Sequence, residues 1–462
     1  MTASLIPPDG FEAPERWTDV GNAKRLVAWH GHSFRYVGQW DRWLRWDGRR
    51  WAADHEGSIV EAAKQVAERL HDEASRYPVG SDDRKAAIKW AMQSEGGSRI
   101  KAMVDLARTD PRVTANPDDF DADPWLLNVD NGTLNLRTGN LKPHDPGTLI
   151  TKLAPTVYDP AASSPTFDAF LAQVLPDDDV REFVTRAIGY SLTGVTSEHK
   201  LFMPYGSGAN GKTTLLEAVR HVLGDYADQA EPDLLLARKD AHPTGVAKLQ
   251  GKRFVTTSET DDKRRLAEAT VKRLTGGDEL TARFMRQDFF EFAPTHKLWL
   301  MTNHRPKVVG TDVGLWRRLR IIPFEVSIPD EKQDRGLDEK LRGEAAGILR
   351  WAVDGCLRWQ ADGLTDPVAV TLATAAYRAD MDTLGEFISE CCELDANTST
   401  AAADLYAAYV EWCKTGGEDP ETQRALGLRL SERGFDRVKQ GRSRRWHWIG
   451  LRLPLQASKV NL

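Results

Sequence analysis

The feature that most constrains the fold of this chain is a glycine-rich stretch near its middle, Gly206 to Thr213, which reads Gly-Ser-Gly-Ala-Asn-Gly-Lys-Thr. A short apolar run, Lys200 to Tyr205, precedes it, and Thr213 to Leu223 follows with apolar residues at helical spacing. The stretch therefore matches the pattern G-x-x-x-x-G-K-[ST] in the strand and helix context that the pattern requires. It predicts an α/β fold with a phosphate-binding loop, and a chance glycine-rich turn is the competing interpretation.

The residue types in this stretch suit a polyphosphate. Glycines let backbone N–H groups approach phosphate oxygens, and the N-terminus of the following helix adds partial positive charge. Lys212 is expected to reach the β- and γ-phosphates, and the Thr213 hydroxyl to help coordinate Mg²⁺. The expected nucleotide-binding residues are Gly206, Ser207, Gly208, Ala209, Asn210, Gly211, Lys212, Thr213 and Thr214.

Length and composition bound the remaining possibilities. A chain of 462 residues suggests about three domains. The net charge of -6 argues against a protein that coats nucleic acid along its whole surface, so basic contacts should be local. The four cysteines lack metal-ligand spacing and read as reduced thiols. Neither a signal sequence nor a long apolar run is visible, so we expect a cytoplasmic protein without a membrane contact, in the bacterial host if a phage or plasmid encodes it.

The N-terminal third reads as a mixed α+β domain. Between Arg25 and Asp54 aromatic residues alternate with arginines, which fits either a surface that stacks single-stranded bases or a β-hairpin turning at Asp47-Gly48 over a small core. The hairpin is favoured because Asp-Gly between aromatic runs is a strong turn signal. Helical patterns follow at 58–77 and 81–107, and 125–136 reads as two short strands around Asn131-Gly132.

An acidic residue at the end of a core strand is expected to activate water in a nucleotide hydrolase. Arg253 to Thr257 has a strand pattern, and Glu259 follows it within Ser-Glu-Thr-Asp-Asp. We assign Glu259 to water activation and to Mg²⁺, together with Thr213. A solvated acidic loop is the plainer alternative.

Three further groups lie downstream. Leu280 to Phe292 reads as a hairpin that carries Arg283, Arg286 and Gln287 near its tip, where they could grip phosphates or simply face water. Asn303 ends the apolar run from Lys297 and fits either a γ-phosphate sensor or a turn residue. Arg317 and Arg318 precede another apolar strand. They fit either an arginine finger that is donated to a neighbouring subunit or a surface pair held in salt bridges.

The C-terminal part reads as a lid followed by a basic module. After a helical stretch at 336–360, helices at 402–415 and 421–433 precede strands at 435–453. Nine basic residues against Glu432 and Asp436 make 424–452 positive: Arg424, Arg429, Arg433, Arg437, Lys439, Arg442, Arg444, Arg445 and Arg452. This pattern favours a winged-helix-like DNA-binding module with Arg442, Arg444, Arg445 and Trp446 on the wing, and a protein-docking module is the alternative.

The order of these features resembles the superfamily-3 helicases, in the branch that holds the phage and plasmid primase-helicases and the poxvirus primase-helicase. The features follow one another in an order that resembles that of the family: the glycine-rich loop, the Glu259 strand, Lys272-Arg-Leu-Thr-Gly-Gly-Asp, Asn303 and Arg317-Arg318. Trp43 to Trp51, Asn131 to Leu136 and Gly189 to Gly194 resemble its N-terminal flanking domain. The resemblance covers nearly the whole chain.

The resemblance implies an AAA+-type ring, usually a homo-hexamer, that hydrolyses ATP with Mg²⁺ at subunit boundaries and moves 3′ to 5′ on single-stranded or forked DNA. The resemblance also implies catalytic roles for Lys212, Glu259, Asn303 and either Arg317 or Arg318. Lys272, Arg283, Arg286 and Gln287 would contact DNA, together with Arg442, Arg444 and Arg445 of the C-terminal module. The implied domains are 1–164 (flanking), 165–335 (ATPase core), 336–370 (helical lid or linker) and 371–462 (winged-helix-like).

Two departures from the family pattern are visible. Ser258 stands where many related ATPases have a first acidic residue, which shifts metal coordination toward Asp261 or water. The flanking domain begins near Arg25, so we expect the helicase half as a separate protein that works with a separate primase or other replication proteins. The alternative functions are an ATP-dependent origin-binding or loader protein, and a small-molecule kinase, which would leave the hairpin and the basic module unused.

Overall fold

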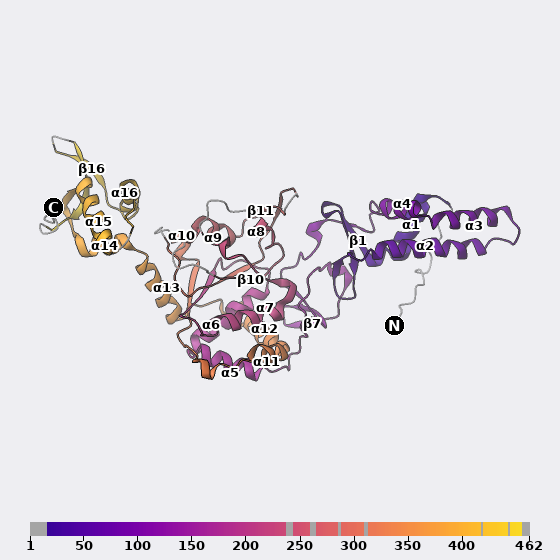
Figure 1. Ribbon diagram of the computed structural model, residues 1–462, viewed down its shortest axis with the longest axis horizontal. Helices are drawn as coiled ribbons and strands as arrows, with labels where there is room; N and C mark the ends of the chain where they lie inside the picture. Colours follow the sequence, from indigo (N-terminus) through magenta and orange to yellow (C-terminus); the bar gives the residue numbers. More distant parts are fainter. Residues whose placement is uncertain are drawn as a thin grey trace.

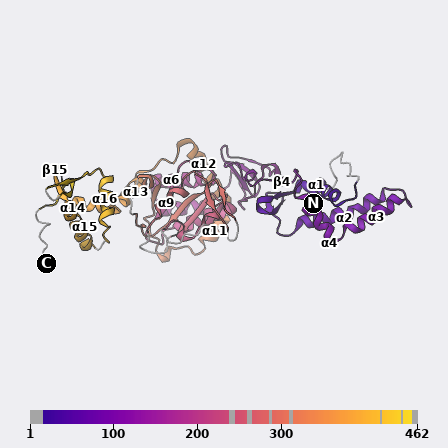
Figure 2. The same ribbon diagram turned by 90° about the horizontal axis from the view of Figure 1, so that it is seen from above.

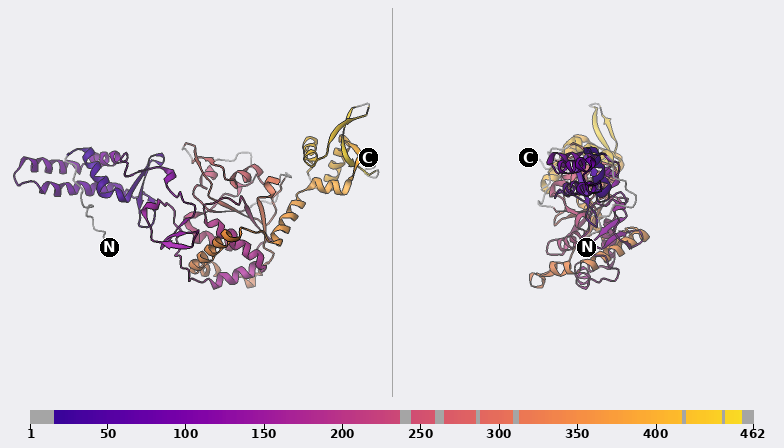
Figure 3. Two further views of the ribbon diagram at one scale, coloured as in Figure 1. Left: turned by 180° about the vertical axis from the view of Figure 1, so that it is seen from behind. Right: turned by 90° about the vertical axis from the view of Figure 1, so that its right-hand side faces the viewer.

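The computed structural model describes residues 16–236, 244–258, 265–284, 288–308, 313–416, 419–441 and 444–454. The molecule is elongated: a helical N-terminal part, a central α/β core and a small C-terminal module follow one another along the long axis (Figures 1 and 2). The view from behind shows the same order, with the N-terminal helices and the C-terminal module at opposite ends (Figure 3, left). In the described ranges every helix is too short or too polar to cross a bilayer.

The central core is built on a five-stranded sheet in which all strands are parallel, in the order β14-β8-β13-β10-β9. Its strands are β8 (Leu201–Tyr205), β9 (Ala227–Gln229), β10 (Phe254–Ser258), β13 (Lys297–Met301) and β14 (Leu319–Pro323). All five residues of β13 are buried, as expected for an internal parallel strand covered on both faces. β13 therefore separates β8, which precedes the glycine-rich loop, from β10, which precedes Glu259.

Helices cover both faces of this sheet, and two buried clusters lie between the layers. One face packs against α5 (Pro165–Val174), α6 (Asp178–Leu192), α7 (Lys212–Leu223), α11 (Leu337–Gly343) and α12 (Ala345–Asp362). The other face packs against α8 (Thr244–Ala247), α9 (Glu268–Leu274), α10 (Val313–Trp316) and α13 (Val368–Asp380). The core also carries the antiparallel hairpin β11 (Leu280–Ala282) and β12 (Phe290–Phe292), which the sequence predicted.

The fifth strand of the sheet, β9, has no counterpart in the sequence analysis. Residues 227–229 form β9, which pairs with β10 in parallel, with Ala227 opposite Phe254. The strand is short and its second and third residues, Asp228 and Gln229, are polar, so it has no apolar pattern to reveal it. It lies at the sheet edge, where burial of a polar strand is not required.

The N-terminal part combines a helical bundle with a four-stranded sheet of order β3-β2-β1-β4. The helices are α1 (Asp19–His30), α2 (Ser58–Ser75), α3 (Asp82–Ser94) and α4 (Gly97–Ala107), and the strands are β1 (Phe34–Val37), β2 (Arg42–Trp46), β3 (Trp51–Ala53) and β4 (Thr114–Ala115). The helical pattern at 81–107 is thus two helices, because the chain breaks at Glu95-Gly96.

The hairpin interpretation of the aromatic and arginine stretch is confirmed. β2 and β3 are antiparallel, with Trp46 opposite Trp51, and the Asp47 N–H donates to the Arg50 carbonyl in the turn. Trp51 is 1% exposed, so it is a core residue and offers no face to a base. The Arg50 guanidinium forms an ion pair with Asp225 of the core.

A small antiparallel sheet joins the N-terminal part to the core. Its strands are β5 (Leu126–Val129), β6 (Gly132–Asn135) and β7 (Asn140–Lys142), of which the first two confirm the prediction around Asn131-Gly132. Leu127 and Leu134 belong to the same buried cluster as the core helices. The buried guanidinium of Arg253, just before β10, donates to the carbonyls of Leu126 and Leu192, both at 2.8 Å, and so ties the small sheet to the core.

The C-terminal module has its own buried cluster and follows α13 directly. In chain order it comprises α14 (Thr383–Cys391), β15 (Glu393–Ala401), α15 (Ala402–Gly416), α16 (Gln423–Glu432), β16 (Arg437–Gln440) and β17 (Arg445–Arg452). The strands form an antiparallel sheet of order β15-β17-β16. The two predicted helices and the strand pair are confirmed, whereas α13, α14 and β15 had no counterpart in the sequence analysis.

Close packing of α6 against α12 gives a first prediction. A Cβ on Gly189 would lie 2.1 Å from the backbone nitrogen of Cys356, so Gly189→Ala must push the two helices apart. We expect a loss of about 1–3 kcal/mol of unfolding free energy, seen as a lower thermal midpoint. Gly343→Ala is the matched control, because a Cβ there meets no atom within 4 Å. Equal midpoints for the two variants would contradict this packing.

Candidate nucleotide-binding site

The glycine-rich loop joins β8 to α7 at the carboxyl edge of the parallel sheet. Three of its residues have positive φ angles: Gly208 (96°), Ala209 (48°) and Gly211 (82°). A Cβ on Gly206 would lie 2.2 Å from the Phe324 carbonyl oxygen, and one on Gly211 would lie 2.6 Å from Val174 Cγ1. Packing behind the loop therefore excludes side chains at these two positions, while the Cβ position of Gly208 is open.

The chain that follows β14 holds the loop in place. The Phe324 N–H donates to the Tyr205 carbonyl and the Ile328 N–H to the Ala209 carbonyl, both at 2.8 Å. The buried Asn210 amide donates to the Phe324 carbonyl at 3.2 Å. The sequence motif identifies Asn210 only as a loop residue, and its side chain proves to be one of the anchors. The loop is thus fixed at both ends before any ligand binds.

Lys212 is the central charge of the site. Its ammonium donates to the Gly206 carbonyl at 2.6 Å, to Asn210 Oδ1 at 3.0 Å and to Asn303 Oδ1 at 3.1 Å. Burial lowers the pKa of this ammonium to about 8. Its described partners are all uncharged acceptors, so its charge is available to an anion. The predicted juxtaposition of the loop with Asn303 is therefore present.

The residues present fit a polyphosphate with a divalent cation. α7 starts at Lys212 and its N-terminus faces the loop, and Ser207 and Thr213 are exposed there. Thr213, the predicted Mg²⁺ ligand, lies in the first turn of α7. Its expected partner Glu259 lies outside the described residues, as does Asp261, while Ser258 is the last residue of β10. Within the described ranges no group of three or more His, Cys, Asp or Glu residues is arranged to hold a metal ion.

The segment after Asn303 is held by residues that the sequence analysis did not single out. The Arg305 guanidinium lies 4.7 Å from the ring centroid of Tyr205, the last residue of β8, and forms an ion pair with Asp380 at the end of α13. The Val308 N–H donates to Met381 Sδ at 3.4 Å. The Asn303 segment therefore contacts both the loop strand and the chain that leads into the C-terminal module.

Arg317 and Arg318 lie at the opposite edge of the sheet from the loop. β14 pairs with β8 in register, Leu319 opposite Leu201 and Pro323 opposite Tyr205, so the arginines precede the strand whereas the loop follows it. At about 3.3 Å per residue this places the backbone of the pair roughly 15 Å or more from the loop of the same chain. The Arg318 guanidinium donates to the Gly314 carbonyl at 2.6 Å, and burial, then Arg317, lowers its pKa. Arg317 is exposed, and its side chain has no hydrogen bond or ion pair in the described ranges.

The β11–β12 hairpin presents aromatic rings beside its predicted cation. The Arg283 guanidinium lies 4.9 Å from the ring centroid of Phe289, which is 61% exposed, and Phe284 stacks on Phe290 at 5.4 Å. Neither exposed phenylalanine was predicted as a contact, although both flank the predicted tip. Arg286 and Gln287 lie outside the described residues, and Lys272 is half-buried in the last turn of α9.

In the C-terminal module, partners outside the basic segment neutralise part of its charge. The guanidinium of Arg429 donates to Glu421 at 2.8 Å, Arg433 forms an ion pair with Asp382, and Arg452 lies 3.5 Å from Glu393. The surplus read from 424–452 alone is therefore too high. Among the predicted contacts, Arg444 and Arg445 are exposed at the start of β17, and Arg442 lies outside the described residues.

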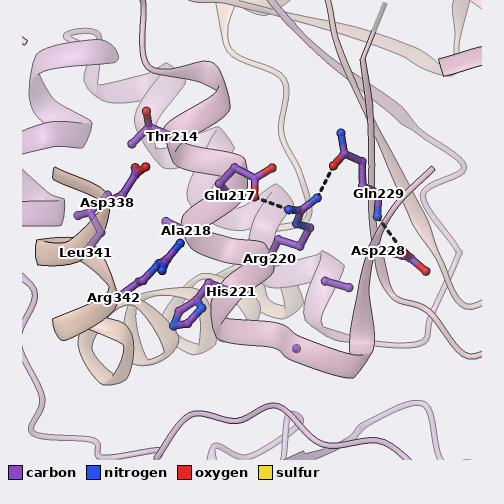
Figure 4. Close-up of a pocket in the computed structure, with 12 residues that line it drawn as sticks. Thr214, Glu217, Ala218, Arg220, His221, Asp228, Gln229, Asp338, Leu341 and Arg342 are labelled. Carbon is purple, nitrogen blue, oxygen red and sulfur yellow. Dashed lines mark hydrogen bonds and ion pairs between the residues drawn. The ribbon is translucent and has the colours of Figure 1, made fainter. Parts of the chain in front are cut away.

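A separate hollow of about 430 Å³ runs along the outer side of α7 (Figure 4). It is lined by α7, α11 and β9, and within it Arg220 donates to Glu217 at 2.5 Å and to Gln229 at 2.7 Å. Thr214 lies at its edge and is shared with the predicted nucleotide-binding residues. The lining mixes acids with bases, so the hollow does not have the positive character of the loop.

Comparison with known proteins gives three family matches. Residues 23–176 match the family described as D5 N terminal like, and residues 379–438 match the poxvirus D5 protein-like family. Residues 205–318, which contain the loop, Asn303 and the arginine pair, match a family of unknown function. The first two matches confirm the predicted resemblance to the poxvirus branch on both sides of the core.

Viral relatives extend over most of the chain. A protein of Acanthamoeba polyphaga mimivirus, provisionally named a helicase, is 28% identical over 342 residues, which is 68% of this chain and 35% of the relative. A provisionally named helicase of Frog virus 3 is 26% identical and covers 56% of this chain and 29% of its own length. A provisionally named primase of African swine fever virus is 26% identical, with 68% and 35% covered. The chain spans about a third of the length of these relatives.

A solved structure, the apo form of the C-terminal region of NrS-1, has a similar fold. It superposes with a TM-score of 0.50 over 95% of this chain and 100% of that one, at 10% identity. At this identity the likeness concerns the fold alone.

The lowered pKa of Lys212 predicts how nucleotide binding depends on pH. A bound polyphosphate raises the pKa of the neighbouring ammonium, so binding takes up a proton once the free site deprotonates. We expect the affinity for a non-hydrolysable ATP analogue to be level below about pH 7. Above about pH 8 it should fall by up to about tenfold per pH unit, as calorimetry can measure. Lys212→Arg is the control, because its guanidinium stays charged in this range. A wild type whose pH profile matches that of Lys212→Arg would contradict the assignment.

Proposed function

Since the chain belongs to the D5-like primase-helicase family, we propose that it is an ATP-driven DNA helicase that moves along single-stranded DNA during phage or plasmid replication. The observation that carries the proposal is the convergence of the glycine-rich loop, Lys212 and Asn303 at one edge of the sheet. In that arrangement the Lys212 ammonium contacts only uncharged acceptors and lies beside a helix N-terminus. Side chains packed behind the loop determine its shape.

The proposed mechanism uses these residues to bind ATP and to position water. Lys212 would leave its amide and carbonyl acceptors to contact the β- and γ-phosphates, and the loop N–H groups would contact the remaining phosphate oxygens. Thr213 would hold Mg²⁺, which supplies charge neutralisation at the transferring phosphoryl group. Glu259 would orient and activate the attacking water. Asn303, released from Lys212 when nucleotide binds, would report the γ-phosphate to the segment that contacts α13.

The position of the arginine pair supports an ATP-hydrolysis site that two copies of the chain share. Because Arg317 and Arg318 lie at the far edge of the sheet, neither is placed to reach the nucleotide of its own chain. A second copy could present its pair to the nucleotide, an effect worth about 10³ to 10⁵ in rate where it operates. Arg317 is the better placed of the two, because it is exposed while the Arg318 guanidinium donates to the Gly314 carbonyl of the preceding helix. A homo-hexameric AAA+-type ring is the assembly proposed.

Two elements are proposed to contact DNA. The β11–β12 hairpin offers Arg283 with exposed Phe284 and Phe289, a combination of cation and aromatic ring that suits a single strand. The C-terminal module has the helix, strand, helix, helix and strand-pair order of a winged helix, with Arg444 and Arg445 on the strand pair. This second element also supports the alternative function, an origin-binding or loader protein that uses ATP to assemble on DNA.

Unwinding of tailed duplexes tests the proposal. We expect the wild type to open a partial duplex with a 3′ single-stranded tail in an ATP-dependent reaction. A duplex with a 5′ tail should stay closed, and Lys212→Ala should lose at least about a hundredfold in unwinding and hydrolysis because no charge then binds the phosphates. An unchanged thermal midpoint shows that the variant is folded. Hydrolysis without opening of either duplex would favour the loader, and unchanged hydrolysis in Lys212→Ala would overturn the nucleotide site itself.

A further inference from the structure

The C-terminal strand pair β16–β17 carries a tryptophan beside two cations. Lys439 is directly opposite Trp446 in the antiparallel register, and Arg437 is opposite Trp448, so these four side chains share one face. The Arg437 guanidinium lies 4.7 Å, and the Lys439 ammonium 5.0 Å, from the centroid of the Trp446 ring. Trp448 is 3% exposed and packs in the core of the module, whereas Trp446 is 43% exposed.

The same strand pair holds cations that the fold does not use. Arg437, Lys439 and Arg445 form no ion pair in the described part of the chain, while Arg429 and Arg433 of the neighbouring helix side are paired with Glu421 and Asp382. The strand pair projects from the body of the module at the far end of the molecule (Figures 1 and 3). The exposed side chains of Arg437, Lys439 and Trp446 are therefore reachable by a large ligand.

Helix α16 is poorly suited to entering a DNA groove. Arg429 in its last turn forms an ion pair with Glu421. Arg433, the residue after the helix, forms an ion pair with Asp382. Its outward side includes Leu428, which is 60% exposed, and ends in the acidic Glu432. A recognition helix in a major groove needs polar or basic side chains along its outer face, and here Arg424 is the exposed basic one.

We propose that the C-terminal module binds single-stranded DNA through the β16–β17 face, with an unpaired base stacked on Trp446 and backbone phosphates on Arg437 and Lys439. The proposal deepens the proposed function and rests on it for the identity of the ligand as DNA. An unpaired base offers a free face for stacking on the exposed indole, whereas a base inside a duplex is already stacked on its neighbours, which favours a single strand over a duplex. Cations beside the ring neutralise phosphates without reading sequence, so binding should not depend on base sequence.

Salt dependence of binding separates contact with phosphate from support of the fold. The full chain would be titrated, without nucleotide, into a fluorescein-labelled oligothymidylate across a series of salt concentrations. Arg437→Gln and Lys439→Gln should each reduce the slope of log affinity against log salt by about 0.7, the value for one phosphate contact on a single strand. Arg424→Gln, an exposed cation on α16 of the same module, is the matched control and should leave the slope unchanged.

The stacking part has its own variants. Trp446→Leu should weaken binding about tenfold or more without changing the salt slope, and Trp446→Phe should restore most of the affinity because it keeps an aromatic face. Thermal midpoints of all variants show whether the module is folded. Three results would each overturn the proposal. The salt slope could be unchanged in Arg437→Gln and Lys439→Gln, it could fall equally in Arg424→Gln, or a duplex of the same length could bind more tightly than the single strand. Hydrolysis of ATP by the wild type, measured on the same preparation, tests the proposed function separately, since the slopes require no nucleotide.

Discussion

The arrangement of the proposed nucleotide site depends on the hydrogen bonds of the Lys212 ammonium, which connect its parts. One ammonium joins the start of the loop (Gly206), its anchor (Asn210) and the end of a different strand (Asn303). Only the strand order β8-β13-β10 brings Asn303 beside the loop, because β13 enters the sheet next to β8 although it is nearly a hundred residues later in the chain. A ligand that takes the ammonium must therefore change the contacts of Asn303, and with them the segment that holds Arg305 against Asp380.

The same sheet separates the arginine pair from the proposed nucleotide site of its own chain. Parallel strands place the loop at their carboxyl ends and Arg317 at the amino end of β14. A phosphate bound at the loop is thus far from the arginines of its own chain, and the exposed Arg317 is oriented by no described partner. The two outer parts lie at opposite ends of the core (Figure 2).

Local patterns predicted the elements around the loop well. The apolar run before Gly206, the helix after it, the Asp47-Gly48 turn and the β11–β12 hairpin each depend on residues close together in the chain, and each was found. What failed depends on contacts between distant residues. β9 is too short and polar to show a pattern, and the partners of Arg429 and Arg433, Glu421 and Asp382, lie outside the segment whose charge was counted. Arg305 could not be recognised, because its partners Tyr205 and Asp380 are separated from it by about a hundred and by 75 residues.

The most direct test of a site shared between copies is to mix two inactive variants, Lys212→Ala and Arg317→Ala, and to measure ATP hydrolysis at constant total protein. If Arg317 acts on the nucleotide of a neighbouring copy, some boundaries in a mixed assembly will combine an intact Lys212 with an intact Arg317, and hydrolysis should return to a substantial fraction of the wild-type rate. If both residues serve the nucleotide of their own chain, every copy in the mixture keeps one defect. The mixture would then stay as inactive as either variant alone, which would contradict the account.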